Sequence, residues 1–295
     1  MWRRKKRSVG EIVIAVILFI YSLSILVPIL HILARSLSDP LKSGSMGGLE
    51  IIPKGLTLIN YKVIFSNKNL VPSILNSIFI TVVGTAINII LTLTSAYVLT
   101  RPKLVGRSAL MIFFIIMMLF DPGIVPEYMV IKGLGLMGSR WSVILCQAVN
   151  VYYMVIMMRY IEAIPPELYE AAQIDGAGHF KMLTKMVFPL TKAGSATLTM
   201  FYAVLRWNEY YRSGIYISKI NKVPLQVILR KFVVSGDVTT LIGTQNLLDY
   251  NDLAKLDYTA LTYATIIVAI IPILIVYPFV LKFYNNDVMA GSVKG

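Results

Sequence analysis

The sequence predicts an all-helical protein embedded in a membrane, and three observations carry that prediction. Charged residues make up 15% of the chain, against about 25% in soluble domains. Apolar residues make up 57%, and they gather in runs about as long as the roughly 20 residues that a membrane-spanning helix needs. A dense basic cluster precedes the first run, as is typical of the cytoplasmic side of a span.

The apolar runs predict six transmembrane helices, at 12–33, 74–99, 109–131, 141–161, 193–217 and 258–283. The first run continues for a full span, whereas a signal peptide would have a shorter apolar region and then a small-residue cleavage site. We therefore expect an uncleaved anchor. Polar residues interrupt the fifth run: Arg206, Asn208, Glu209 and Arg212.

The orientation follows from the basic N-terminal segment, residues 1–11, which predicts a cytoplasmic start. Six spans, within a membrane domain of residues 12–284, return the tail 285–295 to the same side. This topology places the loop 165–190 in the cytoplasm and the loops 35–72 and 213–257 outside. Both outer loops are basic, but the charge rule has less force in long loops.

The remaining residues argue against several other classes of protein. Cys146 is the single cysteine, and His31 and His179 lie far apart with no Cys or carboxylate at ligand spacing, so we expect neither a disulfide nor a metal site. The net charge of +13 comes without a basic stripe interleaved with aromatic residues, so nucleic-acid binding is not expected. The chain also lacks a phosphate-binding loop and hydrolase signatures. It is therefore predicted to have no catalytic site and to bind no ATP or other cofactor.

The cytoplasmic loop between the fourth and fifth runs is the most informative segment. Pro165 and Pro166 followed by Glu167 predict the start of a short helix. Asp175-Gly176 predicts the turn that ends it, and a second helix follows as far as Pro189. The small side chains of Ala171 and Ala172 would let another protein approach closely, and Glu170 beside them supplies a charge for pairing. The loop is thus either a docking element or an ordinary helical hairpin that joins two spans.

The spacing in this loop resembles a known family. Glu170-Ala171-Ala172, then Gly176, Met186 and Phe188-Pro189 are similar to the "EAA" loop of ATP-binding-cassette (ABC) importer permeases, where the pattern is Glu-Ala-Ala, Gly and Ile-x-Leu-Pro. Met for Ile and Phe for Leu are apolar exchanges. The segments 172–177 and 207–210 resemble the carbohydrate branch of that family. Within it, the chain is similar to permeases for complex oligosaccharides, on the side of the second maltose-type subunit.

The resemblance implies the six-helix type I importer fold in a bacterial cytoplasmic membrane. It also implies four kinds of partner, which are a homologous permease subunit, two ATPase subunits that bind ATP and Mg, an extracytoplasmic solute-binding protein and an oligosaccharide, with membrane lipid around the spans. In the family the loop is a coupling helix that seats in a cleft of the ATPase. This role would fall to Glu170, Ala171, Ala172, Asp175 and Gly176.

Polar and aromatic residues within the runs are candidates for contact with a sugar. The amides are Asn76, Asn88, Gln147 and Asn150, and the alternative for each is a hydrogen bond between helices. The segment Trp207-Asn208-Glu209-Tyr210 combines rings and polar groups, although core packing would also explain the rings. Asp121-Pro122-Gly123 is expected to break the third span and either to line a cavity or simply to end the helix.

Two functions of other classes remain open at this point. An ion- or proton-coupled secondary transporter would need no ATPase and would use buried acids as a relay, for which Asp121 and Glu209 are the candidates. A membrane scaffold without transport activity is the third hypothesis.

Overall fold

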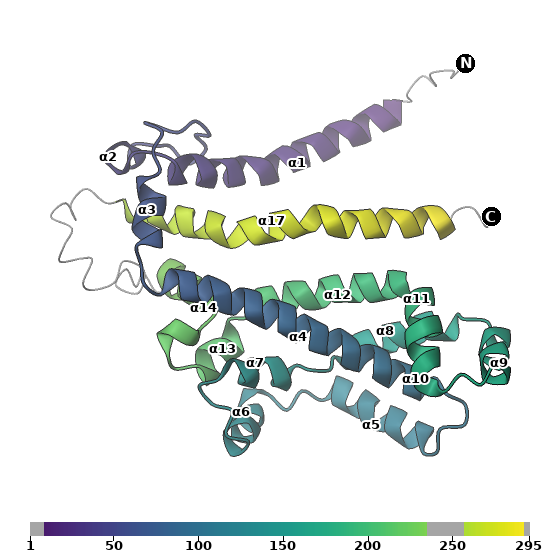
Figure 1. Ribbon diagram of the computed structural model, residues 1–295. Helices are drawn as coiled ribbons and strands as arrows, with labels where there is room; N and C mark the ends of the chain where they lie inside the picture. Colours follow the sequence, from purple (N-terminus) through teal and green to yellow (C-terminus); the bar gives the residue numbers. More distant parts are fainter. Residues whose placement is uncertain (1–8, 235–256, 292–295) are drawn as a thin grey trace. The chain divides into compact units, whose positions relative to one another are not determined.

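A computed structural model describes residues 9–234 and 257–291, with side chains as far as residue 278. The basic N-terminal cluster, residues 235–256 of the predicted outer loop and residues 292–295 of the tail lie outside the described residues. The described chain is helical (Figure 1), apart from turns and one isolated bridge between Ser38 and Leu56. It divides into two compact units, residues 1–70 with 231–271 and residues 71–230 with 272–295.

The first unit begins with three helices, α1 (Val9–Ser36), α2 (Pro40–Ser43) and α3 (Ile59–Phe65). Along the chain then follow α4 (Leu70–Leu99), α5 (Arg107–Leu119), α6 (Ile124–Gly133), α7 (Arg140–Cys146), α8 (Val151–Glu162), α9 (Pro166–Ile174), α10 (His179–Met182), a π-helical turn (Leu183–Val187), α11 (Phe188–Leu190), α12 (Lys192–Trp207), α13 (Tyr211–Tyr216), a 3₁₀ turn (Ile220–Lys222) and α14 (Leu225–Val233). The last helix is α17 (Tyr258–Gly291), which continues into the predicted tail.

Three of the described helices are long and apolar enough to cross a membrane: α1, α4 and the segment Tyr258–Pro278 of α17. The number rises to five if α5 with α6 and α7 with α8 each cross as a bent pair. The bends are 117° and 52°. The first falls at Asp121-Pro122-Gly123, where the sequence predicts a break, because α5 ends at Leu119 and α6 begins at Ile124. The predicted fifth run forms the 16-residue α12 and then the separate α13.

In the first unit, polar contacts tie the loop after α1 to the start of α17. Arg35, in the last turn of α1, pairs with Asp257 at 3.0 Å, and the Ser43 hydroxyl donates to the same carboxylate at 2.5 Å. The buried Asn60 of α3 donates to the carbonyls of Ser36 and Ser38, each at 3.0 Å. Short elements with little core of their own are thereby fixed by side-chain hydrogen bonds.

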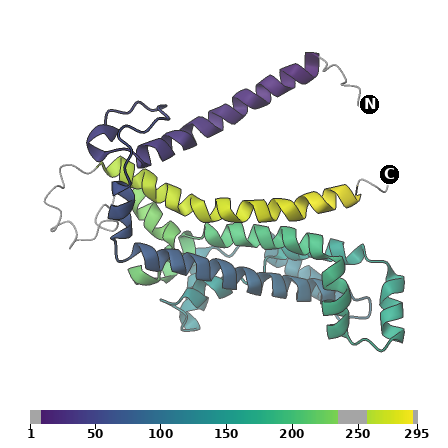
Figure 2. The same cartoon turned by 45° about the horizontal axis from the view of Figure 1, so that its top comes forward.

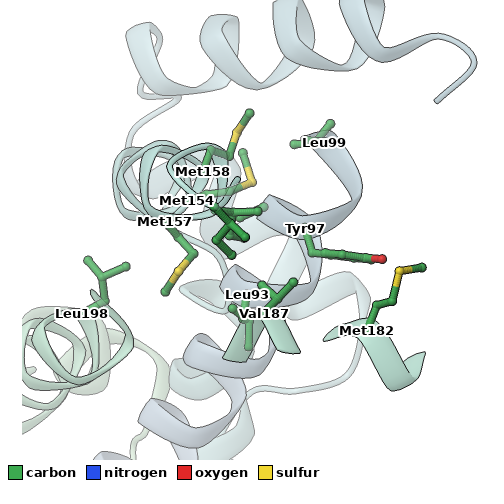
Figure 3. Packing of buried hydrophobic residues seen from close by; sticks show 12 residues of the cluster. Leu93, Tyr97, Leu99, Met154, Met157, Met158, Met182, Val187 and Leu198 are labelled. Atoms are coloured by element: carbon green, nitrogen blue, oxygen red, sulfur yellow. The ribbon is translucent and has the colours of Figure 1, made fainter. Parts of the chain in front are cut away.

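The core of the second unit is rich in methionine. Met154, Met157 and Met158 of α8 lie with Leu93 and Tyr97 of α4 and Leu198 of α12 (Figure 3). Leu99 of α4, and Met182 and Val187 from the chain after α9, complete the labelled cluster. Methionine fills irregular gaps because its side chain is unbranched and flexible. The cluster thus joins α8 and α12, which flank the predicted cytoplasmic loop, to the loop itself.

An amphipathic helix, α14, packs against the same unit. Leu225, Val227 and Ile228 are buried, and the Leu225 N–H donates to the hydroxyl of Ser77 in α4 at 2.8 Å. Arg230 is exposed, so the helix presents a basic face away from the core.

Candidate functional site

The helix α9 starts and ends at signals that are visible in the sequence. Pro166 occupies its first turn, where the missing N–H costs nothing, and Glu167 beside it complements the positive end of the helix dipole. Gly176 ends it with a φ of 70°. The Gly176 N–H donates to the Gln173 carbonyl at 3.0 Å and the Ala177 N–H to the Ala172 carbonyl at 2.9 Å. This pair of bonds is the Schellman motif, which satisfies carbonyls that the helix end leaves free.

The two faces of α9 differ. Tyr169 and Ala172 are partly buried against the methionine-rich cluster, together with Ala177 after the turn. Glu170 and Ala171 are exposed, and the neighbouring Ile174 is 86% exposed. Both views place α9 beyond the ends of α4 and α12 (Figures 1 and 2). The helix therefore presents a carboxylate, a small side chain and a large apolar side chain on one accessible surface.

A stack of aromatic rings around one arginine anchors this hairpin to the end of α4. The guanidinium carbon of Arg101 lies 4.5 Å from the ring centroid of Tyr97 and 4.1 Å from that of Tyr169. The Tyr97 hydroxyl is 3.0 Å from Nδ1 of His179, the first residue of α10. A hollow of about 770 Å³ opens beside the stack, and its lining includes Glu162, Glu170 and Gln173.

The sequence predicts that the second half of the hairpin is one helix that ends at Pro189. The structure differs from this prediction. The chain runs through α10, the π-helical turn and α11, and only Thr191, at φ −99° and ψ 18°, separates it from α12. Pro189 has no N–H to donate to the preceding turn. The π-helical turn directly before α11 changes the bonding pattern at that point, so α12 follows almost without interruption.

The amide candidates take part in hydrogen bonds between elements. The Asn76 amide donates to the carbonyls of Asn221 and Val223 at 2.9 and 3.2 Å, and its oxygen accepts from Arg140 at 3.3 Å. Asn150 caps α8 by accepting the Tyr153 N–H at 3.1 Å. The Asn76 bonds are of the kind that the alternative describes, because they link α4 to other elements, whereas the Asn150 side chain caps its own helix.

Gln147 is the residue directly after α7, and its main-chain carbonyl accepts hydrogen bonds from two other helices. The donors are the Asn88 amide of α4 at 2.6 Å and the Arg206 guanidinium of α12 at 2.8 Å. Arg206 is only 2% exposed. It also donates to the Val143 carbonyl at 2.7 Å and to the Asn88 oxygen at 2.9 Å. Arg206 was not predicted as a site residue from the sequence, although a cation within an apolar run was the signal for it.

The segment after Arg206 is divided between the interior and the surface. Trp207 and Glu209 are 6% and 8% exposed, whereas Asn208 is exposed and Tyr210 is 38% exposed. Glu209 accepts the Arg212 N–H at 2.8 Å, near the start of α13. The Arg230 guanidinium lies 4.7 Å from the ring centroid of Tyr210. The four residues are neighbours in the chain, but only Asn208 and Tyr210 are accessible.

Asp121 lies apart as a surface residue of the bend between α5 and α6. Its carboxylate is exposed and accepts the Gly123 N–H at 2.9 Å. A more enclosed acid occurs nearby in sequence, in α6, where Glu127 forms a two-bond pair with Arg212 at 2.7 and 3.1 Å. The Tyr216 hydroxyl donates to the same carboxylate at 2.8 Å. This network was not predicted, because nothing in the chain's local pattern shows that α6 meets α13.

Comparison with known proteins decides the family. No family model matches the chain. The chain is 34% identical to the polygalacturonan/rhamnogalacturonan transport system permease protein YtcP of Bacillus subtilis (strain 168) over 291 residues, which are 98% of this chain and 100% of that protein. It is 37% identical to the protein LplC of the same organism over 272 residues, 92% of this chain and 90% of that protein. The chain belongs to the ABC sugar-importer permeases.

The solved structures agree with this assignment. The crystal structure of a bacterial ABC transporter involved in the import of the acidic polysaccharide alginate matches with a TM-score of 0.86 and 30% identity. The match covers 96% of this chain and 99% of that one. The resemblance stated from the EAA loop is thereby confirmed, and the ion-coupled transporter and the scaffold are excluded as functions.

The permease is a multi-pass membrane protein of an importer for oligosaccharides, and it works with an ATPase and a solute-binding protein. It is not itself catalytic, since a partner ATPase hydrolyses the ATP. Among the residues that the structure describes, no three His, Cys, Asp or Glu side chains gather as metal ligands would.

Proposed function

We propose that this permease is one of two homologous subunits that together form the translocation pathway of an oligosaccharide importer in the bacterial cytoplasmic membrane. Two ATPase subunits and one extracytoplasmic binding protein complete the assembly. The six spans are α1, α4, the pair α5–α6, the pair α7–α8, α12 and α17, within residues 12–284. Both termini, residues 1–11 and 285–295, lie in the cytoplasm, and the loops 35–72 and 213–257 lie outside.

The hairpin at residues 165–190 is the proposed coupling element, and the two-faced helix α9 is the observation that supports this. Glu170 and Ala171 are exposed beside Ile174, while Ala172 packs inward and the Asp175-Gly176 turn fixes the end of the helix. An accessible charge next to a flat apolar patch suits a cleft in a partner protein. The permease binds no ATP or Mg itself, and both sit on the ATPase.

In the proposed mechanism, the permease transmits a conformational change and transfers no electrons or protons. Closure of the two ATPase subunits on ATP pushes the two coupling hairpins together and turns the pathway outward. Sugar released from the binding protein enters, and hydrolysis returns the pathway to the inside. No covalent step occurs in this chain.

Purification of the assembled complex tests the coupling role. Glu170→Arg reverses an exposed charge at the proposed contact, so we expect the ATPase to separate from the membrane subunits during purification. Glu167→Arg is the matched control, because Glu167 is an exposed acid in the first turn of the same helix. An ATPase that stays bound to Glu170→Arg as firmly as to Glu167→Arg contradicts the coupling role.

For the cargo, we propose an acidic oligosaccharide, and the basic outer end of the second unit supports this class. Arg140 and Arg230 each lie over an aromatic ring, with the guanidinium carbon 4.5 Å from the ring centroid of Phe79 for Arg140 and 4.7 Å from that of Tyr210 for Arg230. Over the ranges that the structure describes, neither is paired with an acid. An arginine held against a ring can still offer its edge to a carboxylate, and in Arg140 one nitrogen of that edge already donates to the Asn76 oxygen at 3.3 Å. Relatives whose names mention polygalacturonan and alginate point the same way.

The pathway candidates differ in how they serve this cargo. Asn208, Tyr210 and Asp121 are accessible and are proposed to contact sugar. The others are proposed to shape the pathway from behind: Asn76, Gln147, Asn150, Trp207 and Glu209.

Arg230→Gln should raise the KM for uptake of a galacturonate trisaccharide by roughly threefold, the effect of an exposed charge pair. An equal change for a neutral trisaccharide, or no change for the acidic one, contradicts this proposal.

A further inference from the structure

The spans on either side of the coupling hairpin contact each other along their whole length. The helix α8 enters the hairpin and α12 leaves it, and the two contact each other. Near the hairpin, a Cβ on Gly194 would lie 2.5 Å from the ring of Tyr160, so backbone and ring are already in contact. Further along, the rings of Tyr202 and Tyr153 meet edge to face at 4.9 Å.

Four residues of α12 make this contact from one face. Gly194, Leu198, Tyr202 and Arg206 follow one another at intervals of four, which places them on one side of the helix. Leu198 lies in the cluster that contains Met157 (Figure 3). Arg206 is the last of the four and reaches Gln147, just before α8. Its distance from Gly194 along the helix is roughly 18 Å, from the rise per residue.

At this far end, Arg206 occupies the break between α7 and α8. Because α7 ends at Cys146 and α8 begins at Val151, the last carbonyls of α7 lack donors from their own helix. Arg206 donates to three of them: Val143 at 2.7 Å, Ile144 at 2.9 Å and Gln147 at 2.8 Å. The positive charge also complements the negative end of the α7 dipole.

The helix α4 closes the arrangement from behind. Asn88, fully buried, accepts from Nε of Arg206 at 2.9 Å and donates to the carbonyls of Gln147 and Ala148 at 2.6 and 2.8 Å. Gly84 leaves room for the arginine, since a Cβ there would lie 3.0 Å from Nε. Lysine could not reproduce this set, because its ammonium lacks the planar fork of donors.

We propose that Arg206 is a positioning residue that makes the break in the α7–α8 span move with α12, so that displacement of the coupling hairpin reaches the interior of the membrane domain. The inference rests on the proposed coupling role of the hairpin. The break is held to α12 by the three charged hydrogen bonds of Arg206 and by one neutral bond, in which the Asn150 N–H donates to the Tyr202 hydroxyl at 3.3 Å. The described contacts between α8 and α12 nearer the hairpin are packing contacts. Loss of the grip would leave the hairpin free to move without moving the break.

Two site-specific probes in the assembled importer test this inference. Spin labels are placed at Lys185, exposed in the hairpin, and at Val149, 39% exposed in the break, each in a Cys146→Ala background. A non-hydrolysable ATP analogue is then added. In the otherwise wild-type importer, both labels should change mobility. In Arg206→Lys, the Lys185 response should persist, and the fraction responding at Val149 should fall roughly tenfold or more, as expected for lost charged hydrogen bonds.

The other outcomes are equally decisive. A Val149 response that survives Arg206→Lys, or that is absent from the otherwise wild-type importer while Lys185 responds, overturns the inference. If Lys185 itself does not respond in the otherwise wild-type importer, the coupling role fails instead. If Arg206→Lys does not assemble, Gly84→Ala takes its place, since it displaces the guanidinium without removing it, and its Val149 response must be lost in the same way. Arg35→Lys, in the first unit, is the matched control and should leave both responses intact.

Discussion

Single residues at the turn after α9 show how the chain fixes the proposed docking surface. The Asp175-Gly176 turn has two closing hydrogen bonds, and both depend on the φ of 70° at Gly176. For a side chain with a Cβ this region costs roughly 1–2 kcal/mol, except that Asn tolerates it better. The direction of α9, and with it the exposure of Glu170, thus depends on one glycine.

The first prediction concerns this glycine. Gly176→Val should destabilise the turn by about 1–2 kcal/mol and weaken retention of the ATPase during purification of the complex. Gly176→Asn should retain much more ATPase than Gly176→Val, because Asn enters the left-handed region readily. If the two variants retain equal amounts of ATPase, the conformation of the turn does not control docking.

A second residue-scale prediction concerns Asp257, which lies just before α17. Burial alone would raise the pKa of Asp257, but the hydrogen bonds from Ser43 and Arg35 outweigh it, and the pKa is lowered. A lowered folded pKa stabilises the fold above the unfolded value, near 3.9, and this contribution is lost as the pH falls through the folded value. At neutral pH the contribution is complete.

We therefore expect Asp257→Asn to lower stability at pH 7 by about 1–3 kcal/mol, the cost of leaving a buried partner unpaired. The measurement is the melting temperature of the detergent-solubilised complex at neutral pH and at acidic pH, down to values below about 4, the range in which an ordinary Asp titrates. The gap between wild type and Asp257→Asn should narrow at the acidic end. A gap that is the same at every pH would show that the ionised carboxylate is not responsible.

At the scale of elements, α8 and α12 form the rigid connection on which the coupling account depends. Gly194→Ala would place a Cβ 2.5 Å from the Tyr160 ring, so the helices must separate or the ring must move. We expect a loss of about 1–3 kcal/mol, typical of overpacking, measured as thermal stability of the solubilised complex. Gly133→Ala is the control, since nothing lies within 4 Å of its added Cβ. Equal stability of the two variants contradicts the close contact.

Some elements could be predicted from the sequence because their causes are local. The apolar runs, the start of α9 at Pro166, its end at Gly176 and the break at Asp121-Pro122-Gly123 all follow from nearby residues. The break between α7 and α8 could not be predicted, since Gln147 to Asn150 contain no proline or glycine. Its stability comes from Asn88 and Arg206, which are far away in sequence.

The candidate site likewise contains residues that could be predicted from the local sequence and contacts that could not. The coupling residues from Glu170 to Gly176 form a continuous segment, so their spacing was enough to propose them. The polar interior is assembled from α4, α6, α7, α12 and α13. Asn76 and Gln147 stood out as amides in apolar runs. Nothing near them in sequence shows that Arg140 meets the Asn76 side chain or that Arg206 meets the Gln147 main-chain carbonyl. The Glu127–Arg212 pair was equally hidden, because contacts between distant helices leave no local pattern.

At the scale of the whole molecule, the proposed coupling hairpin lies at one end of α4, and the proposed sugar-binding Arg140 lies near the other. Tyr97, near the end of α4, lies at the hairpin, and Asn76, near its start, lies beside Arg140. The separation along the helix is roughly 30 Å, the thickness of a membrane's hydrocarbon core. In the proposed topology, one helix therefore connects the side where ATP is used to the side where sugar arrives.

The most direct test of the account is sugar uptake by the importer in sealed vesicles. The vesicles contain the permease with its homologous partner and the ATPase, and the binding protein and a labelled galacturonate trisaccharide are outside. ATP on the ATPase side should drive accumulation in the wild type, and Glu170→Arg should abolish it while Glu167→Arg does not. Accumulation driven by an ion gradient without ATP, or undiminished in Glu170→Arg, would contradict the account.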